Sequence, residues 1–111
     1  MQNGIYKLKI DVQEPYLSLI KSGKKKIEGR LGKDKYLLLQ KGDLIKINDI
    51  EIEILRVTKY ISFREMLIKE GVENTIPGAK DLNEAINVYY KFYSKEDEKK
   101  FGVVGILIKL K

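Results

Sequence analysis

Strict alternation of apolar and charged residues marks the middle of the chain, in the segment KGDLIKINDIEIEILRVTKY. The alternation has the period of two that places successive side chains on opposite faces of a strand. It predicts two strands, Leu44–Ile47 and Ile50–Tyr60, joined at Asn48-Asp49 in a tight hairpin. Because each strand carries one apolar row of side chains, the chain has to fold around a sheet with a buried face.

Three further segments have the composition of strands. The segments GIYKLKIDV and KIEGRL alternate in the same way, and the β-branched residues of GVVGILIKLK predict a well-buried last strand. A return of this last strand to the first would let the sheet close on itself. The prediction is a small curled sheet of about five strands.

Helical spacing of apolar residues occurs in three places. In EPYLSLIKSG a short apolar stripe lies between Pro15, which suits a first turn, and Gly23, which suits a C-cap. The segments SFREMLIKEG and DLNEAINVYYKFYS each begin with a capping-box pattern. The acidic and basic run KEDEKK is interpreted as a solvated turn. With two to three short helices beside the sheet, the expected fold class is α+β.

Composition limits the chemistry that the chain can perform. Its 111 residues favour one domain over residues 1–111, without a membrane span or a secretion signal, and hence a cytoplasmic location. The lack of cysteine and histidine excludes disulfides, Cys/His zinc sites and histidine-based catalysis. The net charge of +6 favours polyanions as partners. Only three of the 22 basic residues are arginine, which favours backbone or shape recognition over reading of base edges in a groove.

Charged residues cluster in the segment GKKKIEGRL, which follows the first predicted helix. In a regular strand Glu28 and Arg30 share one face, so they could form an ordinary surface ion pair. Alternatively, Lys25, Glu28 and Arg30 converge on one polar ligand. Lys25 can join Glu28 only if the regular strand begins later than Lys25, near Ile27.

The same segment resembles the signature of the ASCH family, a glycine, lysine, glutamate and arginine at fixed spacing, here Gly23, Lys25, Glu28 and Arg30. The order of the surrounding elements is also similar over nearly the whole chain. The resemblance implies a small PUA-like β-barrel and the handling of RNA or nucleosides. Branches of this family bind RNA, act in transcription coactivation, cleave RNA or hydrolyse 4-acetylcytidine.

Three functions remain open at this point. The first is recognition of RNA or a modified nucleoside, with contacts from Gly23, Lys24, Lys25, Lys26, Glu28, Arg30 and Tyr90. The second is hydrolysis of an acylated cytidine or of RNA, for which the resemblance implies Lys25 and Glu84, with Glu28 as a further carboxylate. The hydrolase branch has a threonine where this chain has Glu28, so the hydroxyl nucleophile is missing. The third is a protein-interaction module.

Two of these residues also have purely structural interpretations. Glu84 lies three residues after Asp81, where a capping box places a carboxylate. Tyr60, Tyr89, Tyr90 and Tyr93 are candidates for stacking on a base. Because Tyr89, Phe92 and Tyr93 follow one helical stripe, they are interpreted as core, which leaves Tyr90 as the better exposed stacking residue. No cofactor and no metal is predicted, and a monomer is favoured.

Overall fold

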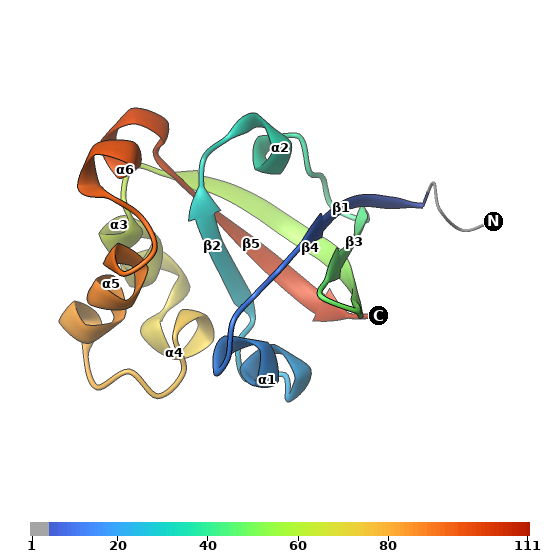
Figure 1. Cartoon of the computed structure of the whole chain (residues 1–111), viewed down its shortest axis with the longest axis horizontal. Coiled ribbons are helices and arrows are strands. Elements are labelled where there is room, and N and C mark those ends of the chain that lie inside the picture. Colours follow the sequence, from blue (N-terminus) through green and yellow to red (C-terminus); the bar gives the residue numbers. More distant parts are fainter. Residues whose placement is uncertain (1–4) are drawn as a thin grey trace.

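The computed structural model describes residues 5–111, which are built around a mixed five-stranded sheet (Figure 1). The strands are β1 (Tyr6–Ile10), β2 (Ile27–Leu31), β3 (Leu44–Ile47), β4 (Ile50–Tyr60) and β5 (Val103–Leu110). Their order in the sheet is β1-β3-β4-β5-β2, and only the β1/β3 pair is parallel. The predicted α+β class is confirmed.

The predicted hairpin is present between β3 and β4. Ile47 pairs with Ile50, which leaves Asn48 and Asp49 as the two turn residues. Asn48 has a φ of 55°, the left-handed conformation that asparagine tolerates better than most residues. Its side-chain oxygen also accepts a hydrogen bond from the Val12 amide at 2.9 Å, so the turn holds the chain that leaves β1.

The predicted closure of the sheet between the last strand and the first is wrong. β5 pairs with β4 along almost its whole length and with β2 on its other side. Since β5 has no free edge, β1 pairs with β3 instead. Within residues 5–111, β1 and β2 are therefore the two edges of a sheet that is not closed into a barrel.

Within residues 5–111, six helices accompany the sheet, more than the two to three predicted. They are α1 (Tyr16–Lys21), α2 (Asp34–Leu37), α3 (Phe63–Glu70), α4 (Val72–Thr75), α5 (Leu82–Tyr90) and α6 (Lys95–Phe101). α3 to α6 follow one another between β4 and β5 and gather at one end of the molecule (Figure 1). No helix within residues 5–111 combines the length and the apolar character needed to cross a membrane.

The segment predicted as a solvated turn, KEDEKK, forms most of α6. The Ser94 side chain caps this helix by accepting a hydrogen bond from the Asp97 amide at 3.0 Å. Acidic residues occupy the first turn and lysines the last turn, which is the arrangement that the helix dipole favours. The charge run is thus a capped helix on the surface.

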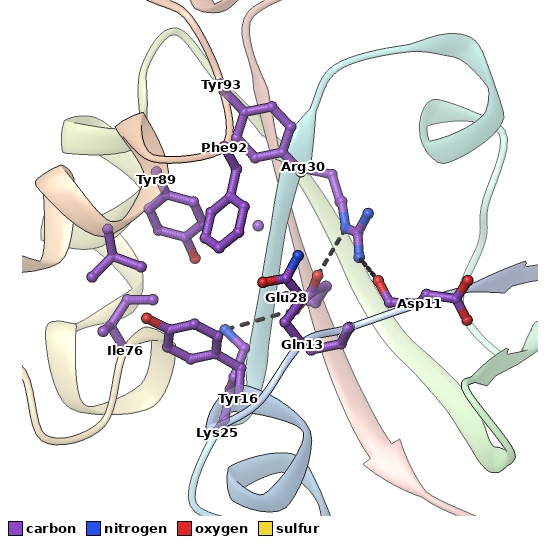
Figure 2. Close-up of a pocket in the computed structure, with 13 residues that line it drawn as sticks. Asp11, Gln13, Tyr16, Lys25, Glu28, Arg30, Ile76, Tyr89, Phe92 and Tyr93 are labelled. Carbon is purple, nitrogen blue, oxygen red and sulfur yellow. Dashed lines mark hydrogen bonds and ion pairs between the residues drawn. The ribbon is translucent and has the colours of Figure 1, made fainter.

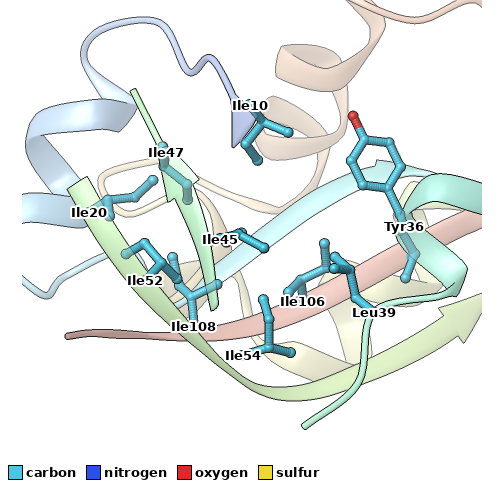
Figure 3. Packing of buried hydrophobic residues seen from close by; sticks show 11 residues of the cluster. Ile10, Ile20, Tyr36, Leu39, Ile45, Ile47, Ile52, Ile54, Ile106 and Ile108 are labelled. Carbon is cyan, nitrogen blue, oxygen red and sulfur yellow. The ribbon is translucent and has the colours of Figure 1, made fainter. Parts of the chain in front are cut away.

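Two apolar clusters lie on opposite faces of the sheet. The first fills its curled face and includes Ile45, Ile52 and Ile106 (Figure 3). The second joins the other face to α3 and α5 and includes Phe63 and Met66. Because β5 contributes to both clusters, its residues are buried on both sides, which explains the nearly continuous apolar run in its sequence.

Candidate functional site

Strand β2 lies at the sheet edge and directs its side chains to two different surroundings. Ile27 and Leu31 pack in the cluster under the helices. Glu28 and Arg30 alternate with them and point the other way. Gly29 lies between Glu28 and Arg30 in the strand. Because it has no side chain, α3 and α5 can approach β2 closely at this position. A cavity lies along this edge.

This cavity, here named the Glu28 pocket, has a volume of about 220 Å³. It opens between β2, the chain that joins β1 to α1, and the helices α4 and α5 (Figure 2). Its lining residues are Asp11, Val12, Gln13, Tyr16, Lys25, Glu28, Gly29, Arg30, Ile76, Val88, Tyr89, Phe92 and Tyr93.

Lys25 lines the pocket and is almost completely buried (Figure 2). Its ammonium donates to the backbone oxygens of Ile27, at 2.7 Å, and Thr75, at 2.5 Å. The same Nζ lies 3.7 Å from Glu28 Oε1. β2 begins at Ile27, so the condition under which Lys25 can reach Glu28 is met.

Glu28 and Arg30, two positions apart on β2, form a close ion pair at the open edge of the sheet. Arg30 Nε donates to Glu28 Oε2 at 2.8 Å. Arg30 Nη2 donates to the backbone oxygen of Asp11 at 3.1 Å, and Nη1 makes a long contact of 3.4 Å to the Tyr36 hydroxyl. The guanidinium therefore connects β2 with the segment after β1, where no strand pairing exists (Figure 2).

Burial and neighbouring charges shift the pKa values of Lys25, Arg30, Tyr89 and Tyr93. Burial lowers the pKa of Lys25, and the nearby Glu28 carboxylate only partly opposes this effect. Burial also works against the charge of Arg30, but Glu28 and its other neighbours outweigh it and raise the pKa of this guanidinium. Burial raises the pKa of Tyr89 and Tyr93, so both phenols are neutral at ordinary pH.

Aromatic rings form one wall of the pocket and are held from behind by Phe63. The Phe63 ring stacks on Tyr89, with centroids 4.4 Å apart, and on Tyr93, with centroids 5.4 Å apart. Phe92 is exposed at the mouth of the pocket, and Tyr16 faces the wall from α1 (Figure 2). Tyr89 and Tyr93, interpreted as core, thus pack on Phe63 and line the cavity at once. The core interpretation of Phe92 is wrong, because this side chain is 47% exposed.

Several residues predicted for the site lie outside the Glu28 pocket. Gly23, Lys24 and Lys26 are exposed, and Gly23 and Lys26 line a separate, mostly apolar depression of about 300 Å³. Glu84 is exposed, and its amide donates to the Asp81 side chain at 2.9 Å, as the capping interpretation predicts. Its carboxylate accepts a hydrogen bond from the Lys80 amide, one residue before the cap, at 2.9 Å. The Tyr90 hydroxyl donates to Glu98 at 2.5 Å, away from the pocket.

Sequence reasoning did not place Tyr16 and Gly29 in the pocket, and it interpreted the stacking candidates Tyr89 and Tyr93 as core. A glycine inside a strand indicates close approach of another group, so Gly29 carried a usable signal. Helical spacing identified Tyr89 and Tyr93 as inward-facing but could not show that the space inside includes a cavity. Tyr16 had no signal, because its position depends on the path of the chain between β1 and β2.

The charged groups of the pocket suit hydrogen bonding better than metal binding. Residues 5–111 contain no group of three or more acidic, histidine or cysteine side chains that could hold a metal ion. Glu28 offers carboxylate lone pairs beyond those that Lys25 and Arg30 occupy. Arg30 retains N–H groups that no bond within the described residues uses.

Fold and pocket together define a small α+β protein with a buried carboxylate and two cations at a sheet edge. The family model described as ASCH domain matches residues 10–111, so the chain belongs to the ASCH domain family. The resemblance drawn from Gly23, Lys25, Glu28 and Arg30 is thereby confirmed.

Two solved structures are similar over nearly their full length. The crystal structure of hypothetical protein PH0355 is 44% identical, covers 94% of this chain and 98% of its own, and has a TM-score of 0.90. The solution NMR structure of protein PF0455 from Pyrococcus furiosus is 46% identical, covers 93% and 96%, and has a TM-score of 0.78. No curated protein matches the chain.

Proposed function

We propose that this protein recognises RNA or a modified nucleoside by taking one base into the Glu28 pocket. The observation that carries the proposal is the ion pair between buried Glu28 and half-buried Arg30 in a cavity with aromatic residues in its wall. A base has two apolar faces and a polar edge, so it needs stacking surfaces together with fixed donors and acceptors. The pocket offers both kinds of contact.

The hydrogen-bonding groups of the pocket determine which polar edge of a base can bind there. Glu28 can accept hydrogen bonds from an exocyclic amine, and the remaining N–H groups of Arg30 can donate to a carbonyl or a phosphate. Other groups of the protein already hold the Glu28 and Arg30 side chains in place. Ligand binding therefore costs little side-chain conformational entropy. A ligand that combines an amino donor with nearby acceptors matches this arrangement.

Size and charge agree with a single base. The volume of about 220 Å³ lies below the range of about 300–1,000 Å³ that is usual for drug-sized ligands. The net charge of +6 attracts the phosphates of a longer strand. Lys35 lies beside Tyr36, which contacts Arg30, so one lysine stands near the pocket for such a phosphate.

Binding has more support than hydrolysis. The Lys25 ammonium directs its protons at the carbonyl oxygens of Ile27 and Thr75 and at Glu28. Its role is therefore to hold these segments of the pocket wall together. No serine or threonine is among the lining residues, and the Thr75 hydroxyl donates to the Gly71 carbonyl. A hydrolase would therefore have to use water activated by Glu28. The predicted catalytic residue Glu84 contributes no group to the pocket.

The proposal is tested by calorimetric titration of the protein with cytidine, 4-acetylcytidine and a mixed-sequence single-stranded RNA. The same mixtures are analysed by chromatography for deacetylation and for RNA fragments. The expected result is saturable binding without turnover. Turnover that disappears in Lys25→Ala would instead make the protein a hydrolase, and inactivity with all three probes would favour a protein partner.

Glu28→Gln separates the pocket from general electrostatic attraction. It keeps the shape of the side chain but weakens acceptance from an amino group, so nucleoside binding should fall at least about tenfold. Glu53→Gln removes a carboxylate on β4 that does not line the pocket and should bind as the wild type does. Equal losses in both variants would contradict a base site at Glu28.

A further inference from the structure

The Tyr89 hydroxyl is a buried polar group with no hydrogen-bond partner. It is the single such side-chain atom found within residues 5–111, and Tyr89 is only 6% exposed. Figure 2 shows the ring between Ile76 and Phe92 with its oxygen pointing into the Glu28 pocket. A buried hydroxyl without a partner destabilises a protein, and phenylalanine would pack in the same place without that cost.

The strand below the hydroxyl leaves space for it. A Cβ atom added to Gly29 would lie 2.8 Å from Tyr89 Oη and 2.7 Å from Met66 Cε. The hydroxyl can reach this position beside β2 only because residue 29 has no side chain. Gly29 is next to Glu28 in the strand, so the carboxylate and the hydroxyl face the cavity from neighbouring positions.

The two groups have opposite hydrogen-bonding characters. Burial, together with the negative charge of Glu28, raises the pKa of Tyr89 well above its ordinary value. The phenol is therefore protonated and has an O–H to donate, while Glu28 can only accept. A ligand that satisfies both has a donor beside an acceptor.

We propose that Tyr89 is a specificity-determining residue, whose hydroxyl donates to the ring nitrogen of a base while Glu28 accepts from the adjacent exocyclic amine. This inference rests on the proposed function and deepens it. Cytosine and adenine carry an amino group beside an unprotonated ring nitrogen. Uracil presents a carbonyl and an N–H in those places, so its carbonyl oxygen would face the Glu28 carboxylate and be repelled.

The test compares Tyr89→Phe with the wild type in calorimetric titrations with cytidine, adenosine and uridine. The wild type should bind cytidine and adenosine in preference to uridine. Tyr89→Phe should bind the two amino nucleosides at least about tenfold more weakly, because their ring nitrogen then has no donor. Thermal unfolding of the ligand-free variant should occur at a higher temperature than in the wild type, since the unpartnered hydroxyl is gone.

Tyr60→Phe is the matched control. It removes the hydroxyl of another buried tyrosine, whose O–H donates to Glu70 and does not line the pocket. Nucleoside binding should be unchanged in Tyr60→Phe, and its unfolding temperature should be lower than that of the wild type.

The outcomes distinguish this inference from the proposed function. If the wild type binds none of the three nucleosides, both are wrong. If the wild type binds and Tyr89→Phe binds equally well, or loses only thermal stability, the role of Tyr89 is wrong while the pocket stands. A wild type that prefers uridine would also overturn the assignment of donor and acceptor.

Discussion

Gly29 and Gly105 face each other across β2 and β5, at the place where the helices approach the sheet. A Cβ atom on Gly105 would lie 3.1 Å from the Tyr60 ring and 3.3 Å from Met66 Cγ. The corresponding atom on Gly29 would overlap Met66 and Tyr89 more severely. The absence of two side chains thus lets Met66 and Tyr89 pack directly on the strands, with consequences for stability as well as for the pocket.

Gly29→Ala should destabilise the protein by about 1–3 kcal/mol, because the new methyl group has to displace well-packed neighbours. Part of that loss should be relieved in the double variant Gly29→Ala/Tyr89→Phe, where the overlapping hydroxyl is removed. Urea unfolding of the two single variants and the double variant measures the coupling free energy.

Gly105→Ala, combined with Tyr89→Phe, is the control for this coupling. The three atoms nearest to the added methyl group of Gly105→Ala belong to Tyr60 and Met66, and none belongs to Tyr89. The changes in the free energy of unfolding caused by Gly105→Ala and by Tyr89→Phe should therefore be additive within about 0.5 kcal/mol. If the effects of Gly29→Ala and Tyr89→Phe were also additive, the predicted coupling would be wrong. The Tyr89 hydroxyl would then move away from the new methyl group without a cost in stability.

At the residue scale, sequence reasoning reached the charged part of the pocket but assigned most of its aromatic part to the core. Local spacing was enough to predict that Lys25 meets Glu28 if the strand starts near Ile27, because these residues are close in the chain. Tyr16 and Tyr89 come from distant segments, and their meeting depends on tertiary packing that no local pattern records.

At the scale of elements, α6 shows how a charge pattern can conceal a helix. Ser94 followed by Asp97 is the same kind of N-terminal signal that correctly predicted the starts of α3 and α5. The dense charges were interpreted as a sign of solvation, but one of them is buried. Glu98 accepts hydrogen bonds from the Phe63 amide and the Tyr90 hydroxyl, so α6 is joined to both α3 and α5.

This three-helix connection should give the protein a specific response to alkaline pH. Burial, followed by the hydrogen bond to Glu98, raises the pKa of Tyr90 from its ordinary 10.0 to about 12. Between these values the folded protein holds a proton that the unfolded chain has lost, so stability falls as the pH rises. The contribution of Tyr90 should be complete below about pH 10 and should disappear toward about pH 12.

Tyr90→Phe isolates this effect from the other tyrosines. At neutral pH the variant should be less stable by about 1–3 kcal/mol, the usual range for a hydrogen bond to a charged group. The difference between wild type and variant, measured by urea unfolding at several pH values, should shrink between about pH 10 and pH 12. A difference that stays constant over this range would mean that Tyr90 does not titrate differently in the folded state.

At the scale of the whole molecule, the open sheet and the insertion of α3 to α6 between β4 and β5 create the pocket. The alternating segments were sufficient to predict the strands and the α+β class, since each strand pattern is local. They could not determine which strand pairs with β5, because the sheet joins segments far apart in the chain. The edge strands β1 and β2 stay apart as a result, and Arg30 spans the gap beside the cavity.

The net charge of +6 acts on the molecule as a whole and should separate strand binding from base binding. RNA binding releases counterions in proportion to the number of phosphates that the protein neutralises. With about three phosphate contacts, affinity for single-stranded RNA should fall about 20-fold between 50 and 200 mM salt. A neutral nucleoside releases no counterions, and the groups that meet it are buried, so its affinity should change by less than about twofold.

Fluorescence anisotropy of a labelled RNA and calorimetry with cytidine, over the same series of salt concentrations, measure the two dependences. Lys35→Ala should reduce the salt slope for RNA and leave cytidine binding unchanged, because its ammonium is exposed beside Tyr36 and does not line the pocket. If RNA affinity were as insensitive to salt as cytidine affinity, the positive surface would make no contact with the strand. Recognition would then be confined to a single nucleoside in the Glu28 pocket.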